Sequence, residues 1–276
     1  MTFKNKLADL QSRSLTDLTS EETDVLIDEM LSNIGSTDPE LRDGLIYPTI
    51  CRFIEEEGFL SHDQLLHILN TSLDEAHLFY KIGSERDDSV FTRSFSALAV
   101  AAALNADITL NYLSLEAFND VCAQILAYLK AENDARGFIH RKGWAHSVAH
   151  GADMLAQLIR NPKFLTNNFG QILDGIKSCI FKEKFYSDQE EERLLVAIEI
   201  ALEERDIPET TIETWLKSLF DDLAGVLHTE GYSYKYHRYR INLVNFSMTM
   251  YFKFKLKNFR MGLRVFITQL LKELDI

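Results

Sequence analysis

Near the middle of the chain, two histidines and an aspartate recur at the spacing of a helix, and side chains of these types can do chemistry together. His146, His150 and Asp153 lie in the segment AENDARGFIHRKGWAHSVAHGADMLAQL, residues 131–158. The apolar residues around them predict one continuous helix over residues 143–160. At about 100° per residue, such a helix places the three polar side chains on one stripe of its surface.

A metal site is one use of this stripe. Imidazoles four residues apart on a helix can bind one divalent metal ion, and Asp153 could supply an oxygen ligand one turn further on. His146 and His150 have the spacing of the two histidines in the HExxH helix of metalloproteases. Ser147, however, stands at the position where that motif has its general-base glutamate. That class is therefore excluded, and no cofactor other than such a metal ion is expected.

Interpretations without a metal also remain open. Asp153 could orient His150 and raise its basicity, giving a carboxylate and imidazole pair for acid–base catalysis. The stripe could instead line a polar groove that binds a ligand without chemistry, or it could simply face water or a neighbouring helix. Trp144 falls on the opposite side of the predicted helix, so we expect it to be the buried anchor of that helix.

A basic turn leads directly into the predicted helix. Arg136, His140 and Lys142 lie within the sequence ARGFIHRKG, and a helix amino terminus adds unpaired amides and partial positive charge. Together these groups could bind a phosphate or a carboxylate. The competing interpretation is that Arg136 and Lys142 neutralise Glu132 and Asp134 across the same turn.

The composition favours helices joined by short connections. The 276 residues include only 4 prolines and 12 glycines, few for the turns of a sheet-rich fold. Capping residues predict helix starts near Ser20, Asp88, Ser114, Gly143, Thr166 and Pro208, at Asp38 before Pro39, and at capping boxes that begin with Ser61 and Ser187. Starts about 20 to 30 residues apart predict an irregular all-α solenoid of about ten helices, similar to HEAT and armadillo repeats.

We expect one domain over residues 1–276 with an uneven charge. Amino-terminal helices over 1–36 precede an acidic body over 38–230 that holds the histidine motif, and basic helices follow over 231–276. The net charge of −13 makes nucleic acid an unfavourable partner for the whole surface. The tyrosine-rich basic segment GYSYKYHRYRINL is the only candidate surface for nucleic acid, and a helix packed on its own acidic body explains this pattern as well.

The segment YFKFKLK, residues 251–257, alternates between apolar and basic residues like a strand, but we assign it to a helix.

The sequence also predicts the compartment. The amino terminus lacks the apolar core of a secretory signal, and the longest apolar run, Ala97 to Leu104, is far shorter than the roughly 20 residues of a membrane span. Cys51, Cys122 and Cys179 are far apart in the sequence, so free thiols in a reducing cytoplasm are expected.

The segment RGFIHRKGWAHSVAHGAD resembles the central motif of an uncharacterised bacterial family, domain of unknown function 2785. The resemblance extends from about Asp38 to the carboxy terminus and includes LRDGLIYPTI and SVFTRSFSAL. It implies a helical-repeat fold and no particular activity. The positions that match the motif are Arg136, Gly137, His140, Lys142, Gly143, Trp144, His146, His150 and Asp153.

These observations predict a cytoplasmic helical-repeat protein that binds a small anionic ligand or a partner protein segment in a groove. His146, His150 and Asp153 would make the polar contacts, and Arg136 and Lys142 would supply positive charge. The alternative is a hydrolase-like enzyme in which the same histidines and aspartate hold a metal ion or act as acid and base.

Overall fold

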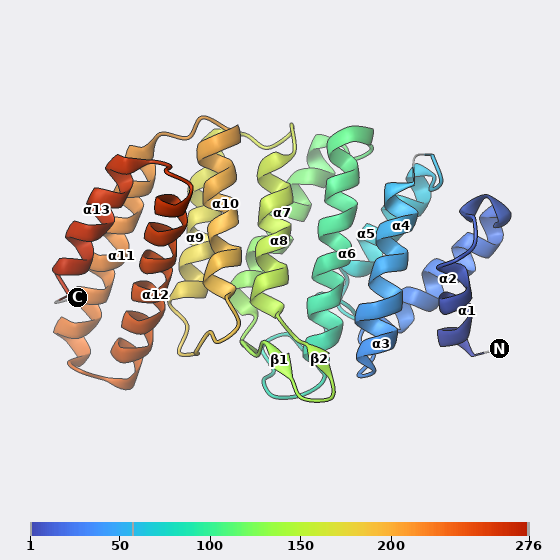
Figure 1. Ribbon diagram of the computed structural model, residues 1–276, viewed down its shortest axis with the longest axis horizontal. Helices are drawn as coiled ribbons and strands as arrows, with labels where there is room; N and C mark the ends of the chain where they lie inside the picture. Colours follow the sequence, from blue (N-terminus) through green and yellow to red (C-terminus); the bar gives the residue numbers. More distant parts are fainter. Residues whose placement is uncertain (1, 57, 275–276) are drawn as a thin grey trace.

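The computed structural model describes residues 2–56 and 58–274 (Figure 1). Its α-helices are α1 (Phe3–Leu10), α2 (Ser20–Ser32), α3 (Pro39–Leu41), α4 (Tyr47–Glu55), α5 (His62–Ser72), α6 (Ser89–Leu110), α7 (Leu115–Ala131), α8 (Ser147–Arg160), α9 (Phe169–Ile180), α10 (Glu190–Glu204), α11 (Glu209–Glu230), α12 (Tyr234–Leu256) and α13 (Met261–Lys272). Short 3-10 turns cover Leu15–Asp17 and Thr166–Asn168, and a π-helical turn, Arg42–Ile46, joins α3 to α4. Two strands of two residues each, β1 (Phe138–Ile139) and β2 (Gly143–Trp144), form one antiparallel hairpin. The described chain is therefore all-α, as the sequence predicts.

The helices stand side by side in chain order, and the two chain ends lie at opposite ends of the row (Figure 1). Within the row, α4 packs against α6, α6 against α8, α8 against α10 and α10 against α12. In the other layer α7 packs against α9, and α11 packs against α13. Consecutive helices thus alternate between two layers over much of the chain, and α4, α6, α8, α10 and α12 share one of them.

The buried apolar side chains form one large cluster and a smaller amino-terminal one, and α6 contributes to both. Leu104 of α6 belongs to the larger cluster, whereas Leu98 belongs to the smaller one. A helix that is apolar around most of its circumference has to be covered on several sides. The apolar run from Ala97 to Leu104 is this central part of α6. No helix in the described ranges is long and apolar enough to cross a membrane.

Most capping predictions are confirmed because local hydrogen bonds decide them. The Asp38 side chain accepts from the amides at the start of α3, and Ser61 and Gln64 form the predicted capping box. Residues 251–256 lie in α12, as expected, and Lys257 is its C-cap.

Three predicted helix starts are wrong, and one of them, Gly143, lies in the β-hairpin. Ser187 caps nothing: its hydroxyl bonds the neighbouring Asp188 carboxylate, and α10 begins after Gln189, whose φ is 68°. Thr166 starts only a short 3-10 turn, and α9 follows it at Phe169.

Candidate functional site

The predicted helix over residues 143–160 is wrong at its amino-terminal end. Gly143 and Trp144 belong to the β-hairpin, and α8 begins only at Ser147. Gly143 has a φ of 78° and His146 a φ of 44°, and neither angle fits a right-handed helix. The amides of Ala145 and His146 instead donate across the hairpin to carbonyls of its other arm, at 2.9 and 3.0 Å.

An arginine from the amino-terminal half of the chain holds this hairpin in place. The guanidinium of Arg42 is fully buried and lies over the rings of Phe91 and Phe95, at 4.1 and 4.7 Å from their centroids. Its Nη2 donates to the Lys142 carbonyl at 2.6 Å and pairs with Asp43 at 2.7 Å. The hairpin is therefore fixed by a residue a hundred positions away in the sequence, for which the sequence analysis had no signal.

Trp144 is not the buried anchor that the sequence predicts. Its side chain is 39% exposed and stacks on the His146 ring with centroids 4.2 Å apart, while Phe138 packs edge-on against it at 5.1 Å. The prediction fails because Trp144 lies on a strand, so the helical wheel does not apply to it. It forms an exposed aromatic cover over His146.

His146 faces a buried carboxylate. Its Nε2 lies 3.7 Å from Oε1 of Glu190, and within the described residues neither buried atom has a hydrogen-bond partner. Burial lowers the pKa of His146 and raises the pKa of Glu190, because both charged forms lose water contact. The pair thus joins the start of α8 to the start of α10 through groups that favour their neutral forms.

His150 is buried in the helix layer, with its ring edge-on to Phe95 at 5.4 Å. Its Nδ1 lies 3.1 Å from the carbonyl oxygen of Ser94, which can only accept, so Nδ1 carries the proton. Burial lowers the pKa of His150 to about 3. The imidazole is therefore neutral at physiological pH and keeps its lone pair on Nε2.

Asp153 is held by α10 and not by His150. Arg193 donates to its carboxylate through Nε, at 3.1 Å, and through Nη2. Burial raises the pKa of Asp153, and the charge of Arg193 opposes this shift. Because Ser94 orients His150 and Arg193 occupies Asp153, the carboxylate and imidazole pair is not formed. In the part of the chain that the structure describes, no group of three or more His, Cys, Asp or Glu side chains is placed to hold a metal ion.

The basic turn is neutralised by nearby carboxylates. Arg136 Nη2 lies 2.6 Å from Asp134, as the competing interpretation expects, and Lys142 Nζ lies 2.7 Å from Asp88. His140 is exposed in the hairpin turn. His140 and Lys142 therefore belong to the hairpin turn, Arg136 precedes the hairpin, and the permanent charges of Arg136 and Lys142 already have carboxylate partners.

Two residues of the predicted stripe, His150 and Asp153, line a groove. A hollow of about 430 Å³ crosses one layer between α4, α6, α8 and α10, and its lining includes His150, Asp153 and Gln157. Ala101 and Ala102 of α6 leave room at its floor. No spacing in the sequence indicates the lining residues of the other helices, among them Tyr47, Cys51, Glu55, Asn105 and Arg193. His146 is not part of the lining. The centroid of its ring lies 5.8 Å from that of His150, which does line the groove.

Another hollow lies next to this groove. It has a volume of about 300 Å³, shares Ile54, Glu55 and Asn105 with the first hollow and reaches Leu110 at the end of α6. The two hollows are therefore neighbours along α4 and α6.

Comparison with known proteins gives a family and no activity. A family model described as protein of unknown function (DUF2785) matches residues 78–252, which include the histidine motif, α6, α8 and α10. No curated protein and no solved structure matches the chain significantly.

Proposed function

Starting from the finding that the chain belongs to the DUF2785 family of proteins of unknown function, we propose that it is a HEAT-like or armadillo-like scaffold whose groove binds an extended polypeptide segment with a basic side chain. The observation that carries this proposal is the pair of neighbouring hollows along α4 and α6, with exposed Glu55 in the lining of both. Helical-repeat proteins commonly bind extended segments along such surfaces.

The charge of the groove favours a cation over the small anion that the sequence suggested. Among the described residues, Glu55, Glu56 and Asp153 supply three carboxylates to the two hollows, and Arg193 is the only Lys or Arg in their lining. That arginine is already paired with Asp153. Glu55 is exposed, and no ion pair is found for it in the described ranges, so a lysine or arginine of the segment can approach it.

The remaining polar groups suit an extended backbone. His150 presents an unprotonated Nε2, which accepts a hydrogen bond, and the amides of Asn105 and Gln157 can both donate and accept. The proposal places the protein in the cytoplasm, where its three free cysteines stay reduced.

The test uses a fluorescently labelled peptide of alternating lysine and alanine and measures its anisotropy as protein is added. Glu55→Gln should weaken binding about 5- to 10-fold, because the substitution removes the free carboxylate and keeps the size of the side chain. Glu116→Gln is the matched control, since Glu116 is also exposed but lies at the start of α7 in the other layer.

Equal losses in the two variants would mean that the peptide binds the acidic surface without using the groove. The anionic alternative has its own readout in the same preparation. Inorganic phosphate that raises the melting temperature of the parent protein and not of Arg193→Gln would favour an anion and overturn the proposal.

A further inference from the structure

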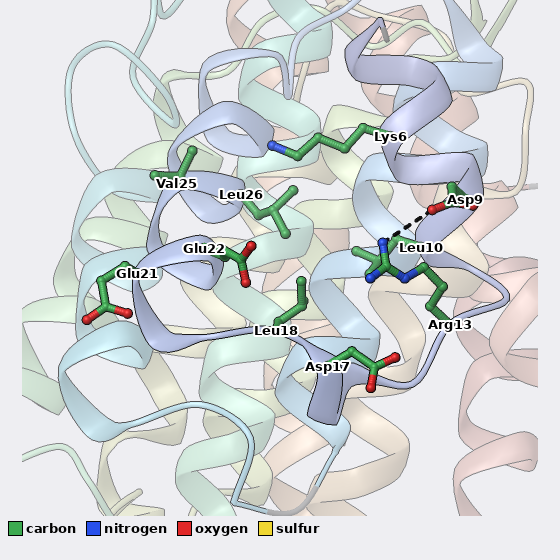
Figure 2. A pocket seen from close by; sticks show the side chains of 10 residues that line it. All are labelled: Lys6, Asp9, Leu10, Arg13, Asp17, Leu18, Glu21, Glu22, Val25 and Leu26. Atoms are coloured by element: carbon green, nitrogen blue, oxygen red, sulfur yellow. Dashed lines mark hydrogen bonds and ion pairs between the residues drawn. The ribbon is translucent and has the colours of Figure 1, made fainter.

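The amino-terminal end of the row holds a hollow of about 450 Å³ between α1 and α2 (Figure 2). Leu10 and Leu26 are buried beneath it, and Val25 is 54% exposed beside it. Figure 2 shows Leu18 near the centre, with carboxylates of α2 and of the preceding turn around it. The hollow therefore combines an apolar floor with an acidic rim.

The excess charge of this hollow is negative. Its two cations are engaged, Arg13 with Asp9 at 3.4 Å and Lys6 with Glu29 at 2.8 Å. No cation pairs with the other three carboxylates of the lining in the described ranges; these are Asp17, Glu21 and Glu22. A partner for this surface has to bring apolar side chains and positive charge together.

The opposite end of the row has that composition. Where α12 ends and α13 begins, Leu256, Met261 and Val265 are 88%, 70% and 53% exposed. Lys255 and Arg264 lie beside them in sequence, and neither has a carboxylate partner among residues 2–56 and 58–274. We name these five residues the carboxy-terminal corner.

The other cations of this region do not contribute to the corner. Lys253 and Lys257 pair with Glu199 of α10, and Arg260 pairs with Glu209 of α11. Carboxylates of α10 and α11 thus neutralise these three cations and leave the charge of Lys255 and Arg264 at the tip of the molecule.

We propose that the carboxy-terminal corner of one molecule docks into the hollow between α1 and α2 of a second copy of this chain. Leu256 and Met261 would cover the apolar floor, and Lys255 and Arg264 would face Glu21 and the other rim carboxylates. A hollow of this volume is in the range that accommodates such groups. A solenoid end that stays monomeric normally has a polar face, whereas this corner exposes large apolar side chains.

The two surfaces lie at opposite ends of one molecule and cannot meet within it (Figure 1). The contact is therefore heterologous. An assembly of any length keeps one unoccupied hollow at one end and one unoccupied carboxy-terminal corner at the other. A contact made by a few side chains is small, so association is expected at tens of micromolar and is weakened by salt.

Sedimentation velocity of the full chain at low salt, from about 5 to about 200 µM, tests the proposal. The average mass should rise with concentration and fall again when about 0.5 M sodium chloride is added. Leu256→Asp blocks the corner by adding a negative charge, and Glu21→Lys blocks the hollow. Each variant alone should stay monomeric over this range, and circular dichroism should show that both remain folded.

The decisive measurement is an equimolar mixture of the two variants. The Glu21→Lys molecule keeps an intact corner and the Leu256→Asp molecule keeps an intact hollow, so the mixture should form dimers and nothing larger. Leu115→Asp is the matched control, because Leu115 is 55% exposed at the start of α7 and lies outside both surfaces. A wild-type protein that stays monomeric, a mixture that does not dimerise, or an equal loss of association in the control would each overturn the proposal.

Discussion

Mild acid should destabilise the protein through His150. Burial holds the pKa of this imidazole at about 3 in the folded protein, against an ordinary value of 6.5. Above pH 6.5 the histidine is neutral in both states. As the pH falls from 6.5 towards 3, only the unfolded chain binds the proton, so the free energy of unfolding decreases.

The size of the effect follows from the difference between the two pKa values. One pH unit corresponds to about 1.4 kcal/mol for a group that titrates only in the unfolded state. At pH 4.5, two units below the ordinary pKa, His150 should therefore have lowered the free energy of unfolding by about 3 kcal/mol. This is a large part of the stability of a typical domain.

Urea unfolding of the wild type and of His150→Asn at several pH values between 7.5 and 4.5 measures this contribution. Asparagine keeps a donor for the Ser94 carbonyl and cannot be protonated in this range. The difference in unfolding free energy between wild type and variant should shrink by about 3 kcal/mol from pH 7.5 to pH 4.5.

The comparison with a variant is needed because other buried groups act in the opposite direction. Burial raises the pKa of Asp153, Glu190 and Glu191, so these carboxyl groups stabilise the folded state as the pH falls through their raised pKa values. They are present in both proteins and cancel in the difference. His228→Asn, at an exposed position of α11, should leave the pH dependence unchanged. If the curves of wild type and His150→Asn stay parallel, the argument that His150 is neutral and buried is refuted.

Two further predictions concern the hairpin. Gly143→Ala should lower the unfolding free energy by about 2 kcal/mol or more, because φ is 78° and a Cβ would lie 2.7 Å from Oδ2 of Asp43. Gly170→Ala is its control: a Cβ there would meet nothing within 4 Å, so denaturant unfolding should show little change or a gain of about 0.5 kcal/mol. In a Trp215→Phe background, the fluorescence of Trp144 should be quenched as the stacked His146 ring becomes protonated, with a midpoint below 6.5 because burial lowers the pKa of His146. His146→Gln should remove this transition, and a midpoint at or above 6.5 would contradict the burial of the ring.

Features that depend on neighbouring residues were predictable. The caps at Asp38 and Ser61 form because each side chain bonds amides two or three residues further along, whatever surrounds the helix. Within α8, His150 and Asp153 line the same hollow, since both lie inside a regular helix where the 100° rotation per residue applies. Whether this groove binds a partner segment stays a prediction.

The amino-acid sequence alone determined the all-α class, most helix starts and the helical part of the stripe, because these follow from local hydrogen bonds and periodic burial. Only the tertiary structure decided the state of the individual side chains. Arg42 reaches the hairpin from a hundred residues away, and Arg193 occupies Asp153 from another helix. Arginines such as buried Arg42 and exposed Arg193 bond whichever carbonyls and carboxylates the packed helices bring to them. Such contacts have no period or spacing in the chain from which they could be predicted.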